Sequence, residues 1–280
     1  MIGGPLREVL LVLVHANLVI AVAATGVAVT ASWILAVPMD PLPIGFVFAA
    51  VFVVYTINRF TDGTADRHNV PGRAAFIVRY GRILMIGCTV VYVVVAIATA
   101  IAKPWLLPLF ALPPVLALGY TSKWIQGTAV RKNGMVGLCW AAIPIGIGGV
   151  HGQLFSASTW VLAIVIAVLL TVAAMLFDLK DIEGDCRVGT QTVPVVIGPA
   201  KTKTLAILGI VGVVPVILAG SLFITPRFLA LGMYVGYFLL VIPFANVDRG
   251  TFFYGLVIDG EHVLVAAVVL LVSCFRSVIP

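Results

Sequence analysis

The stretch DLKDIEGDCRVGTQTVPVVIG, residues 178–198, is the part of the chain around which the rest is organised. It follows directly on a long apolar run and places Asp178, Asp181, Glu183 and Asp185 within eight residues. If the helix of the apolar run continues, Asp178, Asp181 and Asp185 stand at i, i+3 and i+7 and share one face. Like charges stacked in this way repel one another unless a cation lies among them. The pattern therefore predicts a cation site where this segment leaves the apolar run.

A second polar face closes another apolar run far upstream. Asn58, Asp62 and Asp66 stand there at i, i+4 and i+8, again on one side of an expected helix. Two sets of oxygen-bearing side chains, each at the end of a membrane-length segment, indicate a shared site.

The composition indicates a polytopic membrane protein. The 280 residues are 62% hydrophobic and only 10% charged, with a mean hydropathy of +1.18, whereas soluble domains average about 25% charged residues. Because spanning segments in lipid must satisfy their backbone internally, we expect an all-α fold in the bilayer. Residues 1–280 are interpreted as a single transmembrane domain. The net charge of +6 reflects basic membrane loops, and no nucleic-acid partner is expected.

Hydropathy predicts about nine spans. They are placed near residues 9–36, 42–60, 82–102, 104–121, 134–154, 159–177, 203–223, 227–246 and 259–279. The two polar faces end the second and sixth of these spans. This offset of four spans suggests an internal repeat that relates spans one to four to spans five to eight.

The basic residues predict the orientation in the membrane. If the N-terminus is cytoplasmic, 14 of the 17 Lys and Arg residues fall on the cytoplasmic side: Arg7, Arg59, Arg67, Arg73, Arg79, Arg82, Lys123, Arg131, Lys132, Lys180, Arg187, Lys201, Lys203 and Arg249. All the acidic residues except Asp40 are assigned to the same side. We therefore expect a multi-pass protein of the cell membrane with its active-site loops in the cytoplasm.

Carboxylates at helical spacing are hard oxygen ligands that suit Mg²⁺, which usually shares its coordination shell with substrate phosphates. Two facing sets could hold two Mg²⁺ ions with a diphosphate between them. The basic residues of the same loops could neutralise the remaining phosphate charge: Arg67, Arg73, Lys123 and Arg131. The carbon that loses diphosphate must tolerate positive charge, as an allylic prenyl carbon does, and a prenyl tail suits a site among membrane helices.

The two motifs resemble those of a known family. NRFTDGTAD, residues 58–66, is similar to the NDxxDxxxD motif of the UbiA superfamily of intramembrane prenyltransferases, and DLKDIEGD, residues 178–185, resembles its second motif, DxxDxxxD. Residues 187–198 resemble the stretch that follows the second motif. Tyr120 and Lys123 resemble a Tyr and a Lys after the fourth span, and Asn17 stands where members often have Asn.

The resemblance implies an all-helical bundle of about nine transmembrane helices around a central cavity. It also implies Mg²⁺-dependent transfer of a prenyl group from a prenyl diphosphate to a lipophilic acceptor. It assigns the metals to Asn58, Asp62, Asp66, Asp178, Asp181 and Asp185, of which Asp62, Asp66, Asp181 and Asp185 are the predicted catalytic residues. Substrate binding is assigned to Asn17, Asn58, Arg67, Arg73, Tyr120, Lys123 and Arg131, with Lys123 on the diphosphate.

The chain departs from the family pattern in places. Arg59 replaces the usual second Asp of the first motif, and His15 stands about where many members have Arg. The acceptor stays open between an aromatic quinone precursor and a glycerol-based archaeal lipid, geranylgeranylglyceryl phosphate.

A cation- or proton-coupled membrane transporter is the alternative function. Intramembrane carboxylates often mark ion paths, but transporters usually place them near the bilayer midplane. The acidic residues here are expected at span ends, with none in the middle of a span, which favours the enzyme. Asn17 lies inside the first apolar span, where it either lines the cavity or bonds another helix.

Overall fold

The structure is a computed structural model of the chain, and it describes residues 4–61, 67–120 and 128–278. Every regular element in these residues is helical. The first half contains α1 (Gly4–His15), α2 (Leu18–Ile34), α3 (Pro41–Thr61), α5 (Pro71–Ala102), the 3₁₀ helix η1 (Pro104–Ala111) and α6 (Leu112–Tyr120). The second half contains α8 (Ala129–Val150), α9 (Ala157–Asp178), α10 (Ile182–Val188), α11 (Val193–Ile197), α12 (Pro199–Gly212), α13 (Val214–Phe223), η2 (Pro226–Leu231), α14 (Gly232–Val241), η3 (Ile242–Phe244), the π-helix η4 (Phe253–Ile258) and α15 (Asp259–Val278).

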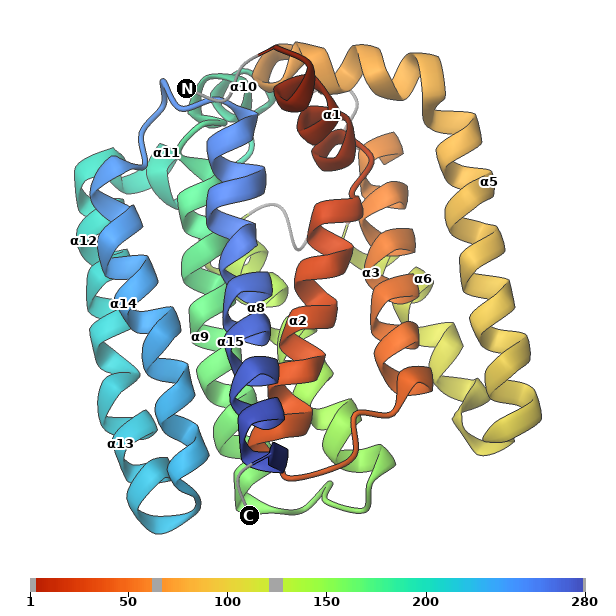
Figure 1. The fold of residues 1–280 in the computed structure, drawn as a ribbon. Coiled ribbons are helices and arrows are strands. Elements are labelled where there is room, and N and C mark those ends of the chain that lie inside the picture. Colours follow the sequence, from red (N-terminus) through yellow and green to blue (C-terminus); the bar gives the residue numbers. More distant parts are fainter. Residues whose placement is uncertain (1–3, 62–66, 121–127, 279–280) are drawn as a thin grey trace.

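Seven described segments are long and apolar enough to cross a membrane, and the bent pair of α1 and α2 makes an eighth if it counts as one span. The seven are Pro41–Phe60, Pro71–Ala102, Ala129–Val150, Ala157–Asp178, Pro199–Phe223, Pro226–Phe244 and Phe253–Phe275. Figure 1 shows these segments side by side in a bundle. The prediction of an all-α, multi-pass fold is confirmed. Against about nine predicted spans, the described residues contain seven or eight long ones and the shorter apolar helix Pro104–Tyr120.

The fourth predicted span is the one that falls short. Residues Pro104–Tyr120 form only a short apolar helix, of which the first part is the 3₁₀ helix η1. Pro108, Pro113 and Pro114 follow one another here, and each removes a backbone donor that a regular α-helix would use. Hydropathy detects the apolar residues of this segment, but it carries no information on the backbone conformation that the prolines impose.

The first predicted span, 9–36, is broken. The axes of α1 and α2 meet at 71°, and Asn17 between them adopts a left-handed backbone with φ of 60°. An amide side chain tolerates this conformation better than most residues do. Figure 1 shows α1 and the first part of α5 lying across the same end of the bundle as α10. This end is called the polar end below, because the acidic segment 178–185 lies there.

The last span begins earlier than the predicted boundary at residue 259. It runs from Phe253 to Phe275 and starts with the π-helix η4. Asp259 and Glu261 therefore lie inside a span, and both are buried, at 8% and 0% exposure. From the sequence the acidic residues are expected at span ends, with none in the middle of a span, whereas Asp259 and Glu261 lie well inside this one.

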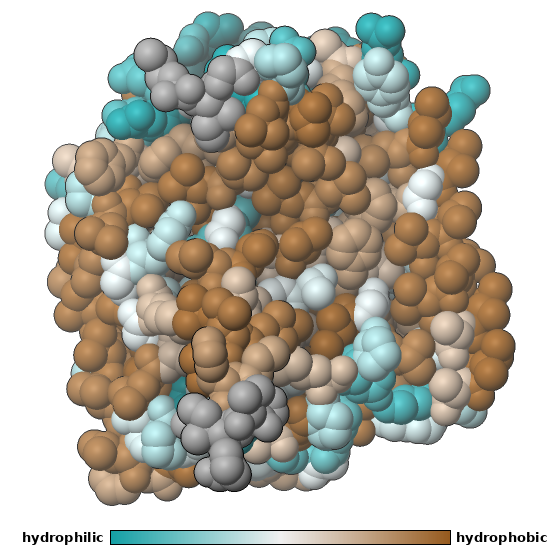
Figure 2. Space-filling view, in the orientation of Figure 1, coloured by the Kyte–Doolittle hydropathy of each residue, from teal (hydrophilic) through white to brown (hydrophobic). Residues whose placement is uncertain are grey.

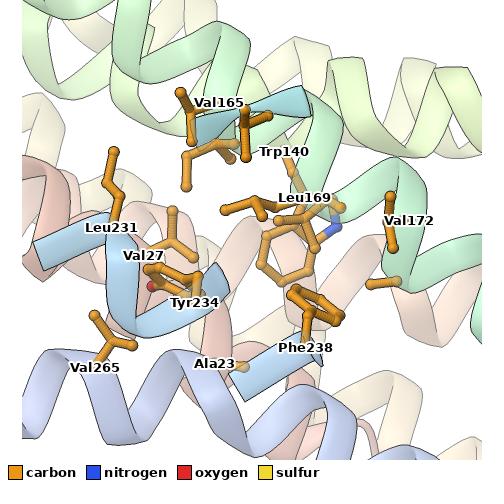
Figure 3. Close-up of a cluster of buried hydrophobic side chains, with 14 of the residues drawn as sticks. Ala23, Val27, Trp140, Val165, Leu169, Val172, Leu231, Tyr234, Phe238 and Val265 are labelled. Carbon is orange, nitrogen blue, oxygen red and sulfur yellow. The ribbon is translucent and has the colours of Figure 1, made fainter. Parts of the chain in front are cut away.

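The core joins elements from both halves of the chain. Figure 3 shows Ala23 and Val27 of α2 and Leu169 of α9 facing the aromatic rings of Tyr234 and Phe238 of α14. On the outside, hydrophobic side chains cover most of the middle of the face in Figure 2, and hydrophilic ones gather towards the polar end and the opposite end. This distribution is that of a protein surrounded by lipid.

Gly137 sets the distance between α8 and α9. A Cβ atom at this position would lie 2.3 Å from the Ala167 carbonyl oxygen and 2.1 Å from Thr171 Oγ1, so an added methyl group must push the helices apart. We expect Gly137→Ala to lower the free energy of unfolding by about 3 kcal/mol. Gly134→Ala is the matched control, because a Cβ there meets nothing within 4 Å. Fluorescence-detected thermal unfolding in detergent compares the two, and equal melting temperatures would contradict the prediction.

Candidate active site

A cavity of about 420 Å³ opens at the polar end of the bundle and extends between the helices. Its wall combines two kinds of surface. Polar and charged side chains come from α3, α5, α8, α9, α10 and α15, and apolar ones come mainly from α2, α8 and α9. The apolar part includes Ile20, Val136, Trp140, Leu170 and Phe177.

The three aspartates of the second motif all line this cavity. The helix does not continue through them as expected: α9 ends at Asp178, and the chain passes through a turn before α10 starts at Ile182. The turn is held by bonds from each N–H to the carbonyl three residues earlier, the last from Asp181 N to Asp178 O at 3.1 Å. This tighter winding keeps side chains three residues apart on one side, so Asp178 and Asp181 still face the same space.

Two residues at the start of α8 hold Asp178. Lys132 Nζ donates to Asp178 Oδ1 at 2.8 Å, and Asn133 Nδ2 donates to Asp178 Oδ2 at 3.0 Å. Lys132 Nζ also lies 4.0 Å from Asp185 Oδ2. Asp181 is paired differently, since Lys180 Nζ donates to its Oδ2 at 2.5 Å. Each aspartate of the second motif therefore lies close to an ammonium group.

The charged groups of the cavity shift one another's pKa values. Burial raises the pKa of Asp185 to about 6, the charge of Lys132 opposes this shift, and the charges of Asp178 and Asp181 add to it. Burial also lowers the pKa of Lys180, where Asp181 opposes the shift and Arg73 and Arg59 add to it. The carboxylates thus act on one another, as do the cations, and the cavity concentrates charge of both signs.

The first motif is only partly described. Asn58 and Arg59 line the cavity, whereas Asp62 and Asp66 lie outside the described residues. Arg59 Nε donates to Asn17 Oδ1 at 3.4 Å, and Asn17 Nδ2 donates to Thr56 Oγ1 at the same distance. The sequence left two roles open for Asn17, which were lining the cavity and bonding another helix. In the structure Asn17 has both roles.

The other predicted substrate residues divide into three groups. Arg73 and Tyr120 line the cavity, and Arg73 is 8% exposed. Arg67 and Arg131 are exposed and are not part of the described wall. Lys123 lies outside the described residues.

A contact between backbone and side chain joins the two motif regions. Asn69 Oδ1 accepts a hydrogen bond from Gly184 N at 2.8 Å, and Asn69 also lines the cavity. A Cβ atom on Gly184 would lie 2.0 Å from that same Oδ1. Further along, Gly189 ends α10 with φ of 75°, a backbone conformation that glycine adopts without strain.

Several cavity residues were not identified from the sequence. Lys132 and Lys180 were assigned only to the basic loops, and Asn69, Asn133 and Asp259 were not singled out. For Lys180 a signal existed, since it stands between two motif aspartates. For Lys132 and Asn133 only the packing of α8 against α9 reveals the contact with Asp178, and for Asp259 only its place on the cavity wall reveals it as a cavity residue.

Comparison with known proteins identifies the family. The UbiA prenyltransferase family matches residues 17–251, so the chain belongs to this family. No curated protein matches the chain. The apo structure of a UbiA homolog from Aeropyrum pernix K1 shares the fold, with a TM-score of 0.68 at 16% identity, covering 91% of this chain and 98% of that one. A structure from a study of digeranylgeranylglyceryl phosphate synthase in membranes gives a TM-score of 0.56 at 15% identity, covering 95% and 96% of the two chains.

Family membership confirms the resemblance that the two motifs indicated. The chain is a multi-pass membrane protein of a prenyltransferase family, which favours the enzyme over the transporter alternative. Which side of the membrane the polar end faces stays a prediction, as do the roles of individual residues.

Proposed function

We propose that this protein transfers a prenyl group from a prenyl diphosphate to a lipophilic acceptor within the membrane, with Mg²⁺ as cofactor. The observation that carries the proposal is the double character of the cavity. Carboxylates meet at its polar end, and an apolar wall continues from them between the spans. A diphosphate and a hydrocarbon tail on one molecule match these two surfaces.

The residues present fit a magnesium site. Asp181 Oδ1 and Asp185 Oδ2 are buried and accept no hydrogen bond from any described residue. Buried carboxylate oxygens without donors are costly unless a cation binds them, and oxygen is the ligand that Mg²⁺ prefers. Among residues 4–61, 67–120 and 128–278, no group of three or more acidic, His or Cys residues is close enough to hold an ion alone. We therefore assign the metals to both motifs together: Asn58, Asp62, Asp66, Asp178, Asp181 and Asp185.

The chain supplies the rest of the diphosphate site. When bound, two Mg²⁺ ions would neutralise the diphosphate and so make it a better leaving group. Lys132 and Asn133 fix the Asp178 carboxylate. Arg73 and Lys180 line the same part of the cavity and place positive charge there, as Lys123 is proposed to do. We propose that these cations bind the phosphate oxygens that the metals leave uncovered.

The acceptor is proposed as either an aromatic quinone precursor or a glycerol-based lipid. Digeranylgeranylglyceryl phosphate synthase, whose fold the chain shares, keeps the second candidate open. The test is transfer by the purified protein in lipid nanodiscs, with labelled prenyl diphosphates of several lengths and both acceptor types. We expect labelled product with Mg²⁺ and none in excess chelator. Equal turnover in chelator would overturn the metal assignment, and no product with any donor would overturn the proposed reaction.

Affinity should rise with the length of the prenyl chain. Each CH₂ group buried against the apolar wall contributes about 0.8 kcal/mol until the cavity is filled. Competition binding of inorganic diphosphate and of diphosphates with 10, 15 and 20 carbons, all with Mg²⁺, measures the trend. Equal affinity for inorganic diphosphate and the longest chain would contradict a tail site.

A further inference from the structure

Asp259 is a carboxylate inside the membrane domain that the metal and diphosphate site does not use. It is the first residue of α15, directly after the π-helix η4, and insertions of this kind are frequent at functional sites. The residue is 8% exposed, and it lines the cavity. It lies six residues inside the span that begins at Phe253, or roughly 9 Å along a helix.

The surroundings of Asp259 differ from those of Asp178. Both oxygens of Asp178 accept hydrogen bonds, from Lys132 and Asn133. Within the described part of the chain, no hydrogen bond or ion pair reaches the Asp259 carboxyl group, although Arg59 and Lys180 act on it electrostatically. Carboxylates inside a membrane are costly and are normally paired or face a cavity. A purely structural aspartate would be expected to accept hydrogen bonds, as Asp178 does. Because no described residue donates one to Asp259, we infer that a ligand does.

A hydrogen-bond donor lines the same cavity. Tyr55 lines the wall, and its hydroxyl interacts electrostatically with Asp259. Trp140 Nε1 donates to Tyr55 OH at 3.3 Å, which leaves the phenolic proton of Tyr55 available to another acceptor. The site therefore offers a carboxyl group that can accept a hydrogen bond, Asp259, and one available donor, Tyr55, beside the indole of Trp140.

We propose that Asp259 and Tyr55 form a subsite that binds a neutral hydroxyl group of the prenyl acceptor. The inference rests on the proposed function and adds the chemical class that the acceptor must present. A hydroxyl group donates one hydrogen bond and accepts another, so it satisfies both residues at once. A carboxylate or phosphate has no proton to donate to Asp259. An ether or a quinone carbonyl can accept from Tyr55 but leaves Asp259 unpaired, which a site of this kind rejects strongly.

Binding of matched probe pairs tests the subsite without turnover. The first pair is 2-naphthol and 2-methoxynaphthalene, and the second is a dialkylglycerol with a free hydroxyl and its methyl ether. The pairs distinguish a phenolic from an alcoholic source of the hydroxyl. The wild-type protein in nanodiscs should bind the hydroxyl form of at least one pair tenfold or more tightly. Binding within twofold for both pairs would overturn the proposal.

Variants assign the preference to the two side chains. Asp259→Leu should reduce the preference to within twofold, and Tyr55→Phe and the isosteric Asp259→Asn should each reduce it at least threefold. Asp248→Asn, an exposed aspartate, is the matched control and should keep the full preference. If Asp259→Leu does not fold, an unchanged preference in both Asp259→Asn and Tyr55→Phe overturns the proposal.

Failure of the subsite and failure of the proposed function are distinguishable. The probes bind without Mg²⁺ or diphosphate, so their discrimination does not depend on transfer chemistry. Affinity for a prenyl diphosphate with Mg²⁺, measured in parallel, should change less than threefold in Asp259→Asn. A larger loss of diphosphate affinity than of hydroxyl preference would place Asp259 in the diphosphate site and overturn the subsite.

Discussion

Replacing Gly184 by alanine is expected to lower prenyl transfer at least a hundredfold. The added Cβ would lie 2.0 Å from Asn69 Oδ1 and 2.4 Å from Asn69 Cγ, so the Asn69 amide must move away or α10 must shift, and the hydrogen bond from Gly184 N is lost in either case. Gly184 stands between the motif residues Asp181 and Asp185, and a shift of about 1 Å in catalytic groups can cost a factor of 100 in rate. Transfer by the purified variant, compared with the wild type under saturating Mg²⁺, measures the effect.

The contact also predicts a specific rescue. Asn69→Ala alone removes the 2.8 Å hydrogen bond to Gly184 N and should reduce activity about tenfold. In the double variant the added Cβ no longer meets the Asn69 amide, so its activity should exceed that of Gly184→Ala alone. Double-mutant analysis then gives a coupling between the two positions.

Gly87→Ala is the control for the glycine substitution, because a Cβ at Gly87 meets nothing within 4 Å. It should keep wild-type activity. Additive effects of the Asn69 and Gly184 changes would contradict the steric explanation, and near wild-type activity of Gly184→Ala would show that the contact does not position the motif.

Much of the architecture could be predicted because lipid imposes simple rules on a sequence. Long apolar runs must be helical, and their ends were located within several residues for most spans. The convergence of Asp178, Asp181 and Asp185 also followed from spacing alone, and it survives although the helix breaks after Asp178. Spacing of three residues keeps side chains on one side in both α and 3₁₀ winding, so the prediction did not depend on the helix type.

What could not be predicted depends on contacts between distant segments. Asn17 breaks the first span by taking a left-handed conformation, and its side chain bonds Thr56 and Arg59 of α3. Hydropathy treats residue 17 as one polar position in an apolar run and carries no information on those partners. The same limit hid Lys132 and Asn133, which look like ordinary loop residues until α8 packs beside the end of α9.

Asp259 shows a second limit. The predicted span boundary at residue 259 placed this aspartate at the membrane surface, where it needs no explanation. The structure starts the span at Phe253 with a π-helix, and the same residue becomes a buried carboxylate on the cavity wall. An error of six residues in the predicted boundary therefore hid a buried carboxyl group on the cavity wall.

Replacing Asp185 by asparagine should abolish Mg²⁺-dependent transfer and yet stabilise the metal-free protein. Asparagine keeps the size and one oxygen but removes the charge that holds Mg²⁺. In the folded protein, burial raises the pKa of Asp185 from 3.8 to about 6, so ionisation of this group opposes folding above about pH 6 and has no such effect below about pH 4. In chelator the variant should therefore exceed the wild type in stability by on the order of 2 kcal/mol at pH 8, and the two should be equal at pH 4.

Ligand linkage reverses the order when substrate is present. With Mg²⁺ and a prenyl diphosphate at about 100 times its Kd, the wild type should gain about 2.7 kcal/mol, because the ligands bind only the folded state. Asp185→Asn should gain little, since it lacks one of the carboxylates proposed to hold the metals. Glu183→Gln is the matched control: Glu183 lies two residues away with its side chain 80% exposed, and its loss should leave transfer and both stabilities unchanged. Full ligand stabilisation of Asp185→Asn, or near wild-type transfer by it, would remove Asp185 from the metal site. A rise in stability that persisted at pH 4 would show instead that its effect on folding does not come from its buried charge.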